Sequence, residues 1–185
     1  MKIKKKLRGK RIHLQIMDAS IENAEKKFLE VDRNRAHLQP WLEWVDETKR
    51  IEDSLRHLFA CESERKKGKK IEYGIYLKKK YIGNIGVFDI SKKHKSAEIG
   101  YWLSKDFIGN GYMKEAVELV ENYFFESSFL HRLQIKCDEK NLASAAVARA
   151  CGYQLEGILR GESWNPYSQS FRNTCVFSKL VSDHK

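Results

Sequence analysis

The chain has 185 residues, of which 42% are hydrophobic and 11% aromatic, so it is long enough for one domain, residues 1–185, with a sizeable core. Its 35 Lys and Arg residues outweigh its 25 Asp and Glu residues, which gives a formal net charge of +10. Two prolines and 11 glycines exclude collagen-like and low-complexity chains, and no run approaches the ~18–20 apolar residues of a membrane span, so we expect a basic cytoplasmic protein that does not contact membranes.

The first part of the chain predicts a strand followed by two helices. Residues 11–17 alternate polar and apolar side chains, which is typical of a strand. Polar residues that can cap a helix precede residues 21–34, and apolar side chains recur at helical spacing near 51–67. The segment 37–49 between these two predicted helices has no clear period.

The middle of the chain predicts three strands joined by lysine-rich turns. Residues 71–78, 80–90 and 97–104 are strand-like and close together in sequence, which favours an antiparallel meander. After Gly111 the apolar period changes from two to about 3.6 residues, as on one face of a helix.

The last third predicts a strand at 132–138, a short alanine-rich helix at 141–151 that Gly152 ends, and two strands around the turn 165–167. The whole pattern indicates a mixed α/β (α+β) domain, in which helices cover a mostly antiparallel sheet.

The four cysteines show no CxxC spacing and stand within apolar or helical patterns. A domain of this size does not need disulfides to be stable, and disulfides are rare in reducing compartments. We therefore expect four buried free thiols, at Cys61, Cys137, Cys151 and Cys175.

Two glycines, Gly109 and Gly111, stand between a predicted strand and a long predicted helix. Glycine permits a tight turn and lets backbone N–H groups approach a ligand, and a helix N-terminus attracts anions such as phosphate. A glycine-rich turn that only lets the chain reverse direction, and binds no ligand, fits the same pattern. The run is neither a Walker loop nor a GxGxxG fingerprint.

A second feature is the segment 141–162. Asn141 is suited to cap the short helix, and Ser144 follows three residues later. Read by itself, the pair fits helix capping as well as ligand binding.

Together, AEIGYWLSKDFIGNGYMKEA (97–116) and NLASAAVARACGYQLEGILR (141–160) resemble the GNAT superfamily of acyl-CoA-dependent N-acetyltransferases, and within it the ribosomal-protein N-terminal acetyltransferase (Rim) type. The resemblance covers nearly the whole chain. It implies a mixed, mostly antiparallel sheet of about seven strands flanked by about four helices. The family loop Gln/Arg-x-x-Gly-x-Gly/Ala corresponds to residues 108–113, where Ile108 replaces the usual polar residue and Met113 the small one.

The resemblance implies acetyl-CoA as co-substrate, with no metal. Its pantetheine arm would follow the strand that ends Trp102-Leu103-Ser104. Its pyrophosphate would rest on the loop and helix start, which comprise Gly109, Asn110, Gly111, Tyr112 and Met113. Asn141 and Ser144 would face the pantetheine and sulfur end.

Acyl transfer from a thioester to an amine requires a neutral amine, donors for the oxyanion and a proton for the departing thiolate. The resemblance gives Glu162 the role of base and Ser144 that of proton donor. Glu98 is an alternative base, Glu162 could instead pair with Arg160 or Arg172, and Ser144 could be only a cap.

The acceptor amine would lie near the segment 37–44, because the family places its acceptor pocket there. The residues expected to line it are Pro40, Trp41, Trp44 and, from the last turn, Trp164, although the tryptophans could equally belong to the core. An N-terminal α-amino group, with a pKa of about 7.7–8, loses its proton more easily than lysine, at about 10.4. We therefore expect the acceptor to be the N-terminal α-amino group of a protein, with a ribosomal protein as one candidate, and a small-molecule amine is the alternative.

Other functions fit less well. His57 and Cys61 stand at helical spacing, but two ligands do not make a metal site. No GxSxG motif of a hydrolase is present. The lysine clusters at 2–11, 64–70, 78–80 and 92–95 leave one alternative, a non-catalytic nucleic-acid- or ribosome-binding module on the same fold. The oligomeric state, monomer or homodimer, stays open.

Overall fold

The computed structural model describes residues 3–127 and 129–184, so Lys2 of the first lysine cluster lies outside the described residues. The elements, in chain order, are β1 (Lys6–Arg8), β2 (Ile12–Gln15), α1 (Ile21–Arg33), α2 (Arg35–Leu38), α3 (Trp44–Glu47), α4 (Ile51–Lys66), β3 (Ile71–Leu77), β4 (Lys80–Ser91), β5 (Ser96–Leu103), α5 (Tyr112–Glu126), β6 (Arg132–Asp138), α6 (Leu142–Ala150), β7 (Gln154–Asn165) and β8 (Ser170–Leu180). Short 3₁₀ turns follow β5, at Lys105–Phe107, and β8, at Val181–Asp183.

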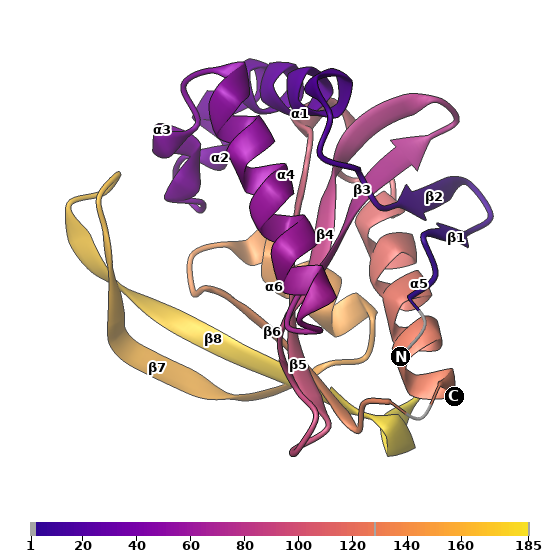
Figure 1. Ribbon diagram of the computed structural model, residues 1–185. Helices are drawn as coiled ribbons and strands as arrows, with labels where there is room; N and C mark the ends of the chain where they lie inside the picture. The colour runs from indigo at the N-terminus through magenta and orange to yellow at the C-terminus, as the bar shows by residue number, and fades with distance from the viewer. Residues whose placement is uncertain (1–2, 128, 185) are drawn as a thin grey trace.

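The strands form one mixed sheet in the order β1-β2-β3-β4-β5-β6-β8-β7 (Figure 1). Neighbouring strands are antiparallel except β5 and β6, which run parallel. A parallel pair needs a crossover connection, and α5 supplies it. Because β3 pairs antiparallel with β4, and β4 pairs antiparallel with β5, the predicted antiparallel meander is confirmed.

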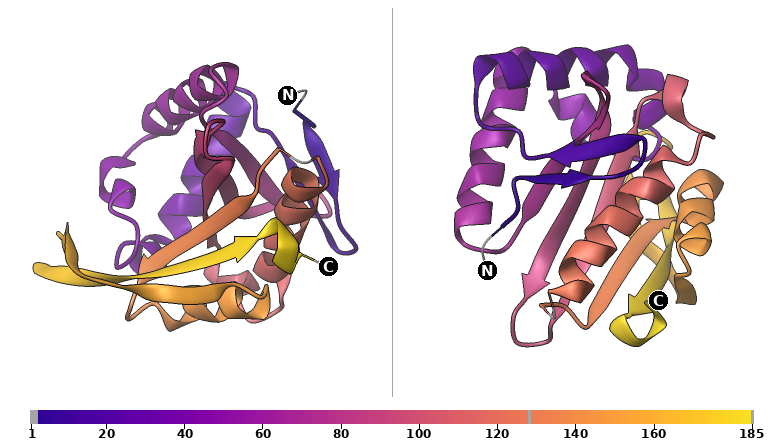
Figure 2. Two further views of the ribbon diagram at one scale, coloured as in Figure 1. Left: turned by 90° about the horizontal axis from the view of Figure 1, so that it is seen from below. Right: turned by 90° about the vertical axis from the view of Figure 1, so that its right-hand side faces the viewer.

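Helices cover both faces of the sheet. Helix α5 packs its apolar side against one face, with α6 beside it, and the main core lies between them and the strands. Helices α1 and α4 lie over the other face, where a second core gathers around buried residues such as Leu58 and Trp102. Figure 2 shows α4 and α5 on opposite sides of the sheet. The hairpin β7–β8 extends from this body as a long curved arm (Figures 1 and 2).

The sheet opens between β5 and β6. These strands pair from Ser96–Arg132 to Ile99–Ile135, and both then continue past the last pair. On its other side β5 stays paired with β4 as far as Leu103. The fork thus leaves the end of β5, residues 100–103, with one strand edge facing a gap in the sheet.

The fold class predicted from the sequence is confirmed, but the element counts are higher than expected: eight strands and six helices in the described chain instead of about seven and four. The added strand β1 has only three residues, of which Leu7 alone is buried, and this is too short for an alternation to be recognised in the sequence. The added helices α2 and α3 span four residues each, which is too short for a helical period to be visible.

All four cysteines are free and buried, as predicted. Within residues 3–127 and 129–184, none of the helices combines the length and the apolar character that crossing a bilayer requires.

Candidate active site

The loop before α5 is shaped by two glycines with left-handed backbone. Gly109 has φ +77° and Gly111 has φ +73°. Gly111 is the N-cap of α5, whose first residue is Tyr112. Side-chain-bearing residues rarely adopt this conformation, so the sequence pattern dictates the turn. The first N–H groups of a 15-residue helix are therefore presented at the loop, together with the positive end of its dipole.

Arg11 holds this loop from the other end of the sequence. Its Nη1 donates a 2.7 Å hydrogen bond to the carbonyl of Asn110, and its Nε donates a 2.8 Å hydrogen bond to Glu115 of α5. Its guanidinium also lies over the ring of Tyr112, 4.8 Å from the centroid. In the sequence Arg11 is only one member of the basic cluster 2–11, and it stands about 100 residues before the loop, so no local pattern links the two.

A cleft of about 680 Å³ lies where the fork, the loop and α6 meet. It is lined by the end of β5, the Gly loop, the first turn of α5, one side of α6, and His37, Leu38, Trp41 and Leu42. Most of the residues predicted to hold a cofactor line it, as does one predicted for the acceptor: Trp102, Leu103, Gly109, Gly111, Tyr112, Met113, Asn141, Ser144 and Trp41.

Two other predicted cofactor residues lie differently. Ser104 is fully buried, and its hydroxyl accepts a 3.2 Å hydrogen bond from Asn34 at the end of α1. Asn110 turns its side chain back onto its own loop and donates to the carbonyl of Ile108 at 3.0 Å. Both residues shape the walls of the cleft, and neither is among its lining residues.

Two hydroxyl groups meet at the fork. Asn141 caps α6 by accepting a 3.1 Å hydrogen bond from the N–H of Ser144, which confirms the predicted cap. The hydroxyl of Ser144 lies 3.2 Å from that of Tyr101 on β5. Burial raises the pKa of Tyr101, although the contact with Ser144 opposes the shift, so the phenol stays protonated. The sequence analysis overlooked Tyr101 because a tyrosine inside a strand pattern looks like a packing residue.

A second cavity, of about 610 Å³, lies on the α4 side of the sheet. It touches β3, β4 and β5, and Trp44 lines it. Tyr101, Trp102 and Leu42 line both cavities. Tyr101 and Trp102, at the end of β5, therefore belong to the walls of both cavities.

The two candidate carboxylates, Glu98 and Glu162, flank Lys136 of β6. Glu98 is half-buried and forms a 3.0 Å ion pair with Lys136. This contact raises the pKa of Lys136, and the charge of Glu162 adds to the effect. Glu162 is exposed and accepts a 2.8 Å hydrogen bond from Thr174. Neither glutamate is among the residues that line the two cavities.

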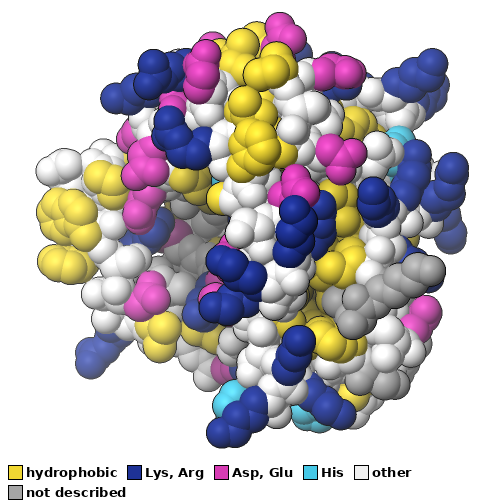
Figure 3. Space-filling model, viewed as in Figure 1, with side chains coloured by type: hydrophobic (Ala, Val, Ile, Leu, Met, Phe, Trp, Pro, Cys, Tyr) yellow, Lys and Arg dark blue, Asp and Glu magenta, His cyan; other side chains and the backbone are white. Residues whose placement is uncertain are grey.

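The arm β7–β8 is tied to the segment before α3. Asn165 donates a 3.0 Å hydrogen bond to the carbonyl of Pro40, and Arg172 forms a 2.5 Å ion pair with Glu43. Trp164 packs edge-on against Phe171 and is half-exposed. Figure 3 shows the surface hollowed between this arm and the body of the domain. Pro40 and Trp164, both predicted to line the acceptor pocket, are not among the lining residues of either cavity.

The site as a whole suits a long ligand with a phosphate end. A helix N-terminus and left-handed glycines offer backbone donors to an anion, and a free strand edge offers further donors and acceptors along its length. The hydroxyls of Tyr101 and Ser144 stand at the inner end, where they can donate a proton to a group that leaves with negative charge.

Comparison with known sequences gives a consistent picture. The family described as acetyltransferase (GNAT) domain matches residues 14–154. The chain is also 28% identical, over 158 residues, to a probable N-acetyltransferase, YjcK, of Bacillus subtilis (strain 168), a match that spans 83% of this chain and 86% of YjcK.

Two solved structures are similar over almost their whole length. The microcin C7 self-immunity acetyltransferase MccE, in complex with acetyl-CoA and AMP, is 26% identical, with a TM-score of 0.87 and coverage of 93% of both chains. RimL, a ribosomal L7/L12 α-N-protein acetyltransferase in complex with coenzyme A, is 23% identical, with a TM-score of 0.89 and coverage of 95% of this chain and 97% of RimL. The likeness to RimL is one of fold.

Proposed function

Because the chain belongs to the acetyltransferase (GNAT) domain family, and is therefore an acyltransferase, we propose that it transfers the acetyl group of acetyl-CoA to the N-terminal α-amino group of a protein. The observation that supports acetyl-CoA as the donor is the β5–β6 fork, which opens onto the Gly109–Gly111 loop at the start of α5. One cleft thus offers a strand edge for the pantetheine amides and a helix N-terminus for the pyrophosphate.

The loop departs from the family pattern at Ile108, which is 46% exposed and brings no polar group. The guanidinium of Arg11 supports phosphate binding in its place. Its Nη2 lies 3.4 Å from the position that a Cβ on Gly111 would take, so a positive charge stands directly beside the loop. The pyrophosphate would be bound by backbone amides, by the positive end of the helix dipole and by Arg11.

The thioester would lie at the inner end of the cleft, where Trp102 and Leu103 line it. Backbone N–H groups of the free edge of β5 would meet the oxyanion. Ser144, supported by Tyr101, would give its proton to the thiolate, since both hydroxyls lie at the fork. Each step uses groups of this chain that are in or beside the cleft.

The acceptor would enter from the second cavity, because Tyr101 and Trp102 line both this cavity and the cleft. A carboxylate then takes the proton of the attacking ammonium, directly or through one water. Glu98 is already bound to Lys136, whereas Glu162 accepts its hydrogen bond from a neutral hydroxyl. We therefore assign the base to Glu162.

A small amine is the second candidate acceptor, supported by the 26% identity to MccE, whose complex contains AMP. An acceptor screen separates the two classes. Peptides with free N-termini, the same peptides with blocked N-termini, and small amines are compared by CoA release. We expect acetylation of free N-termini only. Turnover of small amines with no turnover of peptides would transfer the function to the second candidate.

A non-catalytic basic module would keep the fold without using acetyl-CoA. Lys and Arg side chains are spread over the viewed face among Asp and Glu (Figure 3), which favours solvation over one nucleic-acid footprint. Binding of acetyl-CoA to the native state must raise the melting temperature. At a hundredfold excess over Kd the gain is about 2.7 kcal/mol, or roughly 5–10 °C for a chain of this length. No shift at millimolar acetyl-CoA would contradict the enzymatic function.

The role of Arg11 can be tested by Arg11→Ala. The change removes its contacts to Asn110, Glu115 and Tyr112, so the loop loses its anchor and the phosphates lose a cation. We expect KM for acetyl-CoA to rise about tenfold, while kcat at saturation stays within about twofold.

Arg33→Ala is the matched control, because the side chain of Arg33 is 48% exposed, against 49% for Arg11, and pairs with Glu30 on α1, far along the chain from the loop. We expect its KM to be unchanged. An equal rise of KM in both variants would mean that overall positive charge, and not the position of Arg11, attracts the co-substrate.

A further inference from the structure

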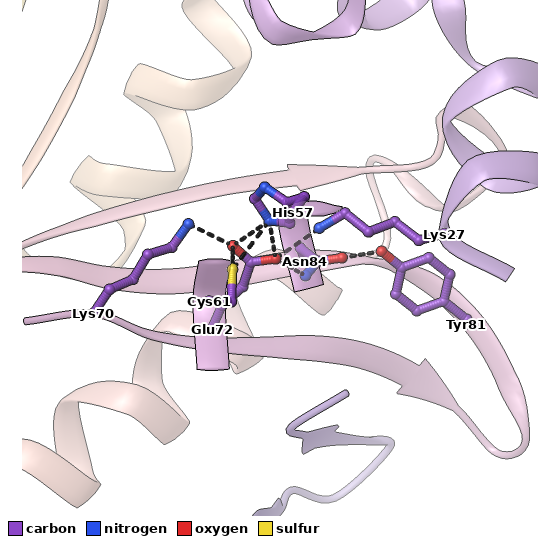
Figure 4. A network of polar contacts seen from close by, with 7 residues as sticks. All are labelled: Lys27, His57, Cys61, Lys70, Glu72, Tyr81 and Asn84. Atoms are coloured by element: carbon purple, nitrogen blue, oxygen red, sulfur yellow. Dashed lines mark hydrogen bonds and ion pairs between the residues drawn. The ribbon is translucent and has the colours of Figure 1, made fainter. Parts of the chain in front are cut away.

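A cluster of metal-binding side chains lies outside the acetyl-transfer chemistry, where α4 packs on β3. The sequence placed His57 and Cys61 on one face of α4 but offered only two ligands. The fold adds Glu72 from β3, and the three ligand atoms converge (Figure 4). The cluster therefore combines nitrogen, sulfur and oxygen donors, the set that transition metals such as zinc prefer.

The distances match one face of a zinc tetrahedron. Nε2 of His57 lies 3.2 Å from Sγ of Cys61 and 3.1 Å from Oε2 of Glu72, and Sγ lies 3.5 Å from the same Oε2. Three atoms about 3.3 Å apart lie about 1.9 Å from their common centre. An ion slightly above this plane would be about 2.0–2.3 Å from each atom, which are the lengths of zinc–ligand bonds.

We propose that His57, Cys61 and Glu72 form a binding site for a zinc-type divalent ion that clamps α4 to β3. The site is separate from Tyr101, Ser144 and Glu162, the groups proposed for acetyl transfer, but it opens into the second cavity, through which the acceptor would enter. Its three protein ligands leave a fourth position, as in sites that keep one exchangeable ligand. His57 and Glu72 both line the second cavity, so a water or a ligand group reaches that position from there.

The neighbours of Glu72 direct one of its oxygens to the ion. Lys27 and Asn84 donate to Oε1 at 2.7 and 2.8 Å, and Tyr81 in turn donates to Asn84. These contacts hold the carboxylate in place, as outer partners of metal ligands do. The pKa of Glu72 also stays well below its usual value: burial would raise it, but Lys27, His57 and Lys70 outweigh burial.

The ammonium group of Lys70 competes with the ion. It lies 2.9 Å from Oε2 of Glu72, the oxygen that would bind the metal. Its side chain is 26% exposed, against 6% for that of Lys27, so Lys70 can turn out to solvent while Lys27 stays in place. Metal binding therefore exchanges one ammonium for one divalent ion at the carboxylate.

Metal binding also releases the proton of the Cys61 thiol, because the thiolate is the ligand. Burial, with the charge of Glu72, raises the pKa of Cys61 to about 11, although Lys70 and Lys27 oppose the shift.

The experiment titrates the full chain with Co²⁺ and Zn²⁺ and follows the thiolate-to-cobalt charge-transfer band and the melting temperature. We expect one Co²⁺ bound per chain, its displacement by Zn²⁺, and stabilisation by Zn²⁺ but not by Mg²⁺. Cys61→Ser should abolish the band, whereas Cys175→Ser, which removes another buried thiol, should leave it unchanged. His57→Gln, at a partly exposed side chain, repeats the test in case Cys61→Ser does not fold.

Lys70→Met distinguishes a metal site from an ordinary ion-pair network. Without the competing charge, Zn²⁺ should bind roughly tenfold more tightly, although the variant loses an ion pair. Unchanged affinity in Lys70→Met would overturn the assignment of Glu72 as a ligand. Absence of a charge-transfer band in the wild type, or a band that survives Cys61→Ser and His57→Gln, would overturn the site itself.

Discussion

Replacing Glu162 with Gln is expected to lower kcat about 100-fold at pH 6.5–7, with little change in the Kd for acetyl-CoA. A positioned general base contributes about 10²–10⁴-fold to a proton-transfer step. Glutamine keeps the size of the side chain and can still accept the hydrogen bond from Thr174, so the variant removes the base and little else. Steady-state kinetics with a peptide acceptor, together with a binding titration, measure the two effects.

The pH profile of Glu162→Gln carries the mechanistic information. Without a base, only the fraction of acceptor that is already neutral can react, and an α-amino group has a pKa of about 7.7–8. The difference in kcat between the wild type and Glu162→Gln should therefore become smaller as the pH rises towards 9. Glu156→Gln, at an exposed residue of the same strand that pairs with Arg132, is the control and should keep normal turnover. A loss of turnover in Glu98→Gln, with normal rates in Glu162→Gln, would give the role to Glu98.

Replacing Gly109 with Val is expected to raise the Kd for acetyl-CoA at least about tenfold, which would remove about half or more of the stabilisation that a hundredfold excess over the wild-type Kd provides. A Cβ at Gly109 would meet no atom within 4 Å, so the added side chain fits without a clash and occupies open space at a residue that lines the cleft, where the phosphates would lie. The φ of +77° adds backbone strain, which costs about 1–2 kcal/mol for a residue with a side chain. Acetyl-CoA binding and unfolding of the free protein are measured in parallel.

Gly68→Val separates strain from blocked binding. Gly68 has φ +71°, and its Cβ would make only ordinary contacts, at 3.8 and 3.9 Å, with the side chain of Lys92. It follows α4, outside the cleft. Both variants should therefore unfold more easily by a similar free energy, and only Gly109→Val should lose co-substrate binding. Normal acetyl-CoA binding by Gly109→Val would remove the loop from the site.

The sequence predicted the fold where patterns are long. Residues 132–138 form β6 with the same bounds, α1 and α4 agree with prediction to within one residue, and α5 begins directly after Gly111 as predicted, because a helix of three or more turns shows its period repeatedly. The strand β1 and the helices α2 and α3 are too short to show any period. Their existence depends on tertiary contacts, which one sequence does not display.

The site was predictable only where a local motif carries it. Gly109, Gly111, Asn141 and Ser144 belong to short patterns with a physical reason for each residue, and all four line the cleft. Arg11, Tyr101 and Glu72 were overlooked, although each touches a predicted or candidate residue. Their importance arises from segments that meet only in the folded chain, such as β2 with α5 or β3 with α4.

The fork between β5 and β6 has a consequence for solubility. A strand edge with unpaired backbone groups is a template on which another chain can add a strand, and this is a common route to aggregation. Here the edge at residues 100–103 lies inside a cleft, between the start of α5 on one side and α6 on the other, and the side chains of Trp102 and Leu103 are buried. A slender molecule can reach this edge, whereas a second sheet cannot approach it. The unpaired N–H and C=O groups of this edge therefore stay available to a ligand, while strand addition by a second protein chain is blocked at this place.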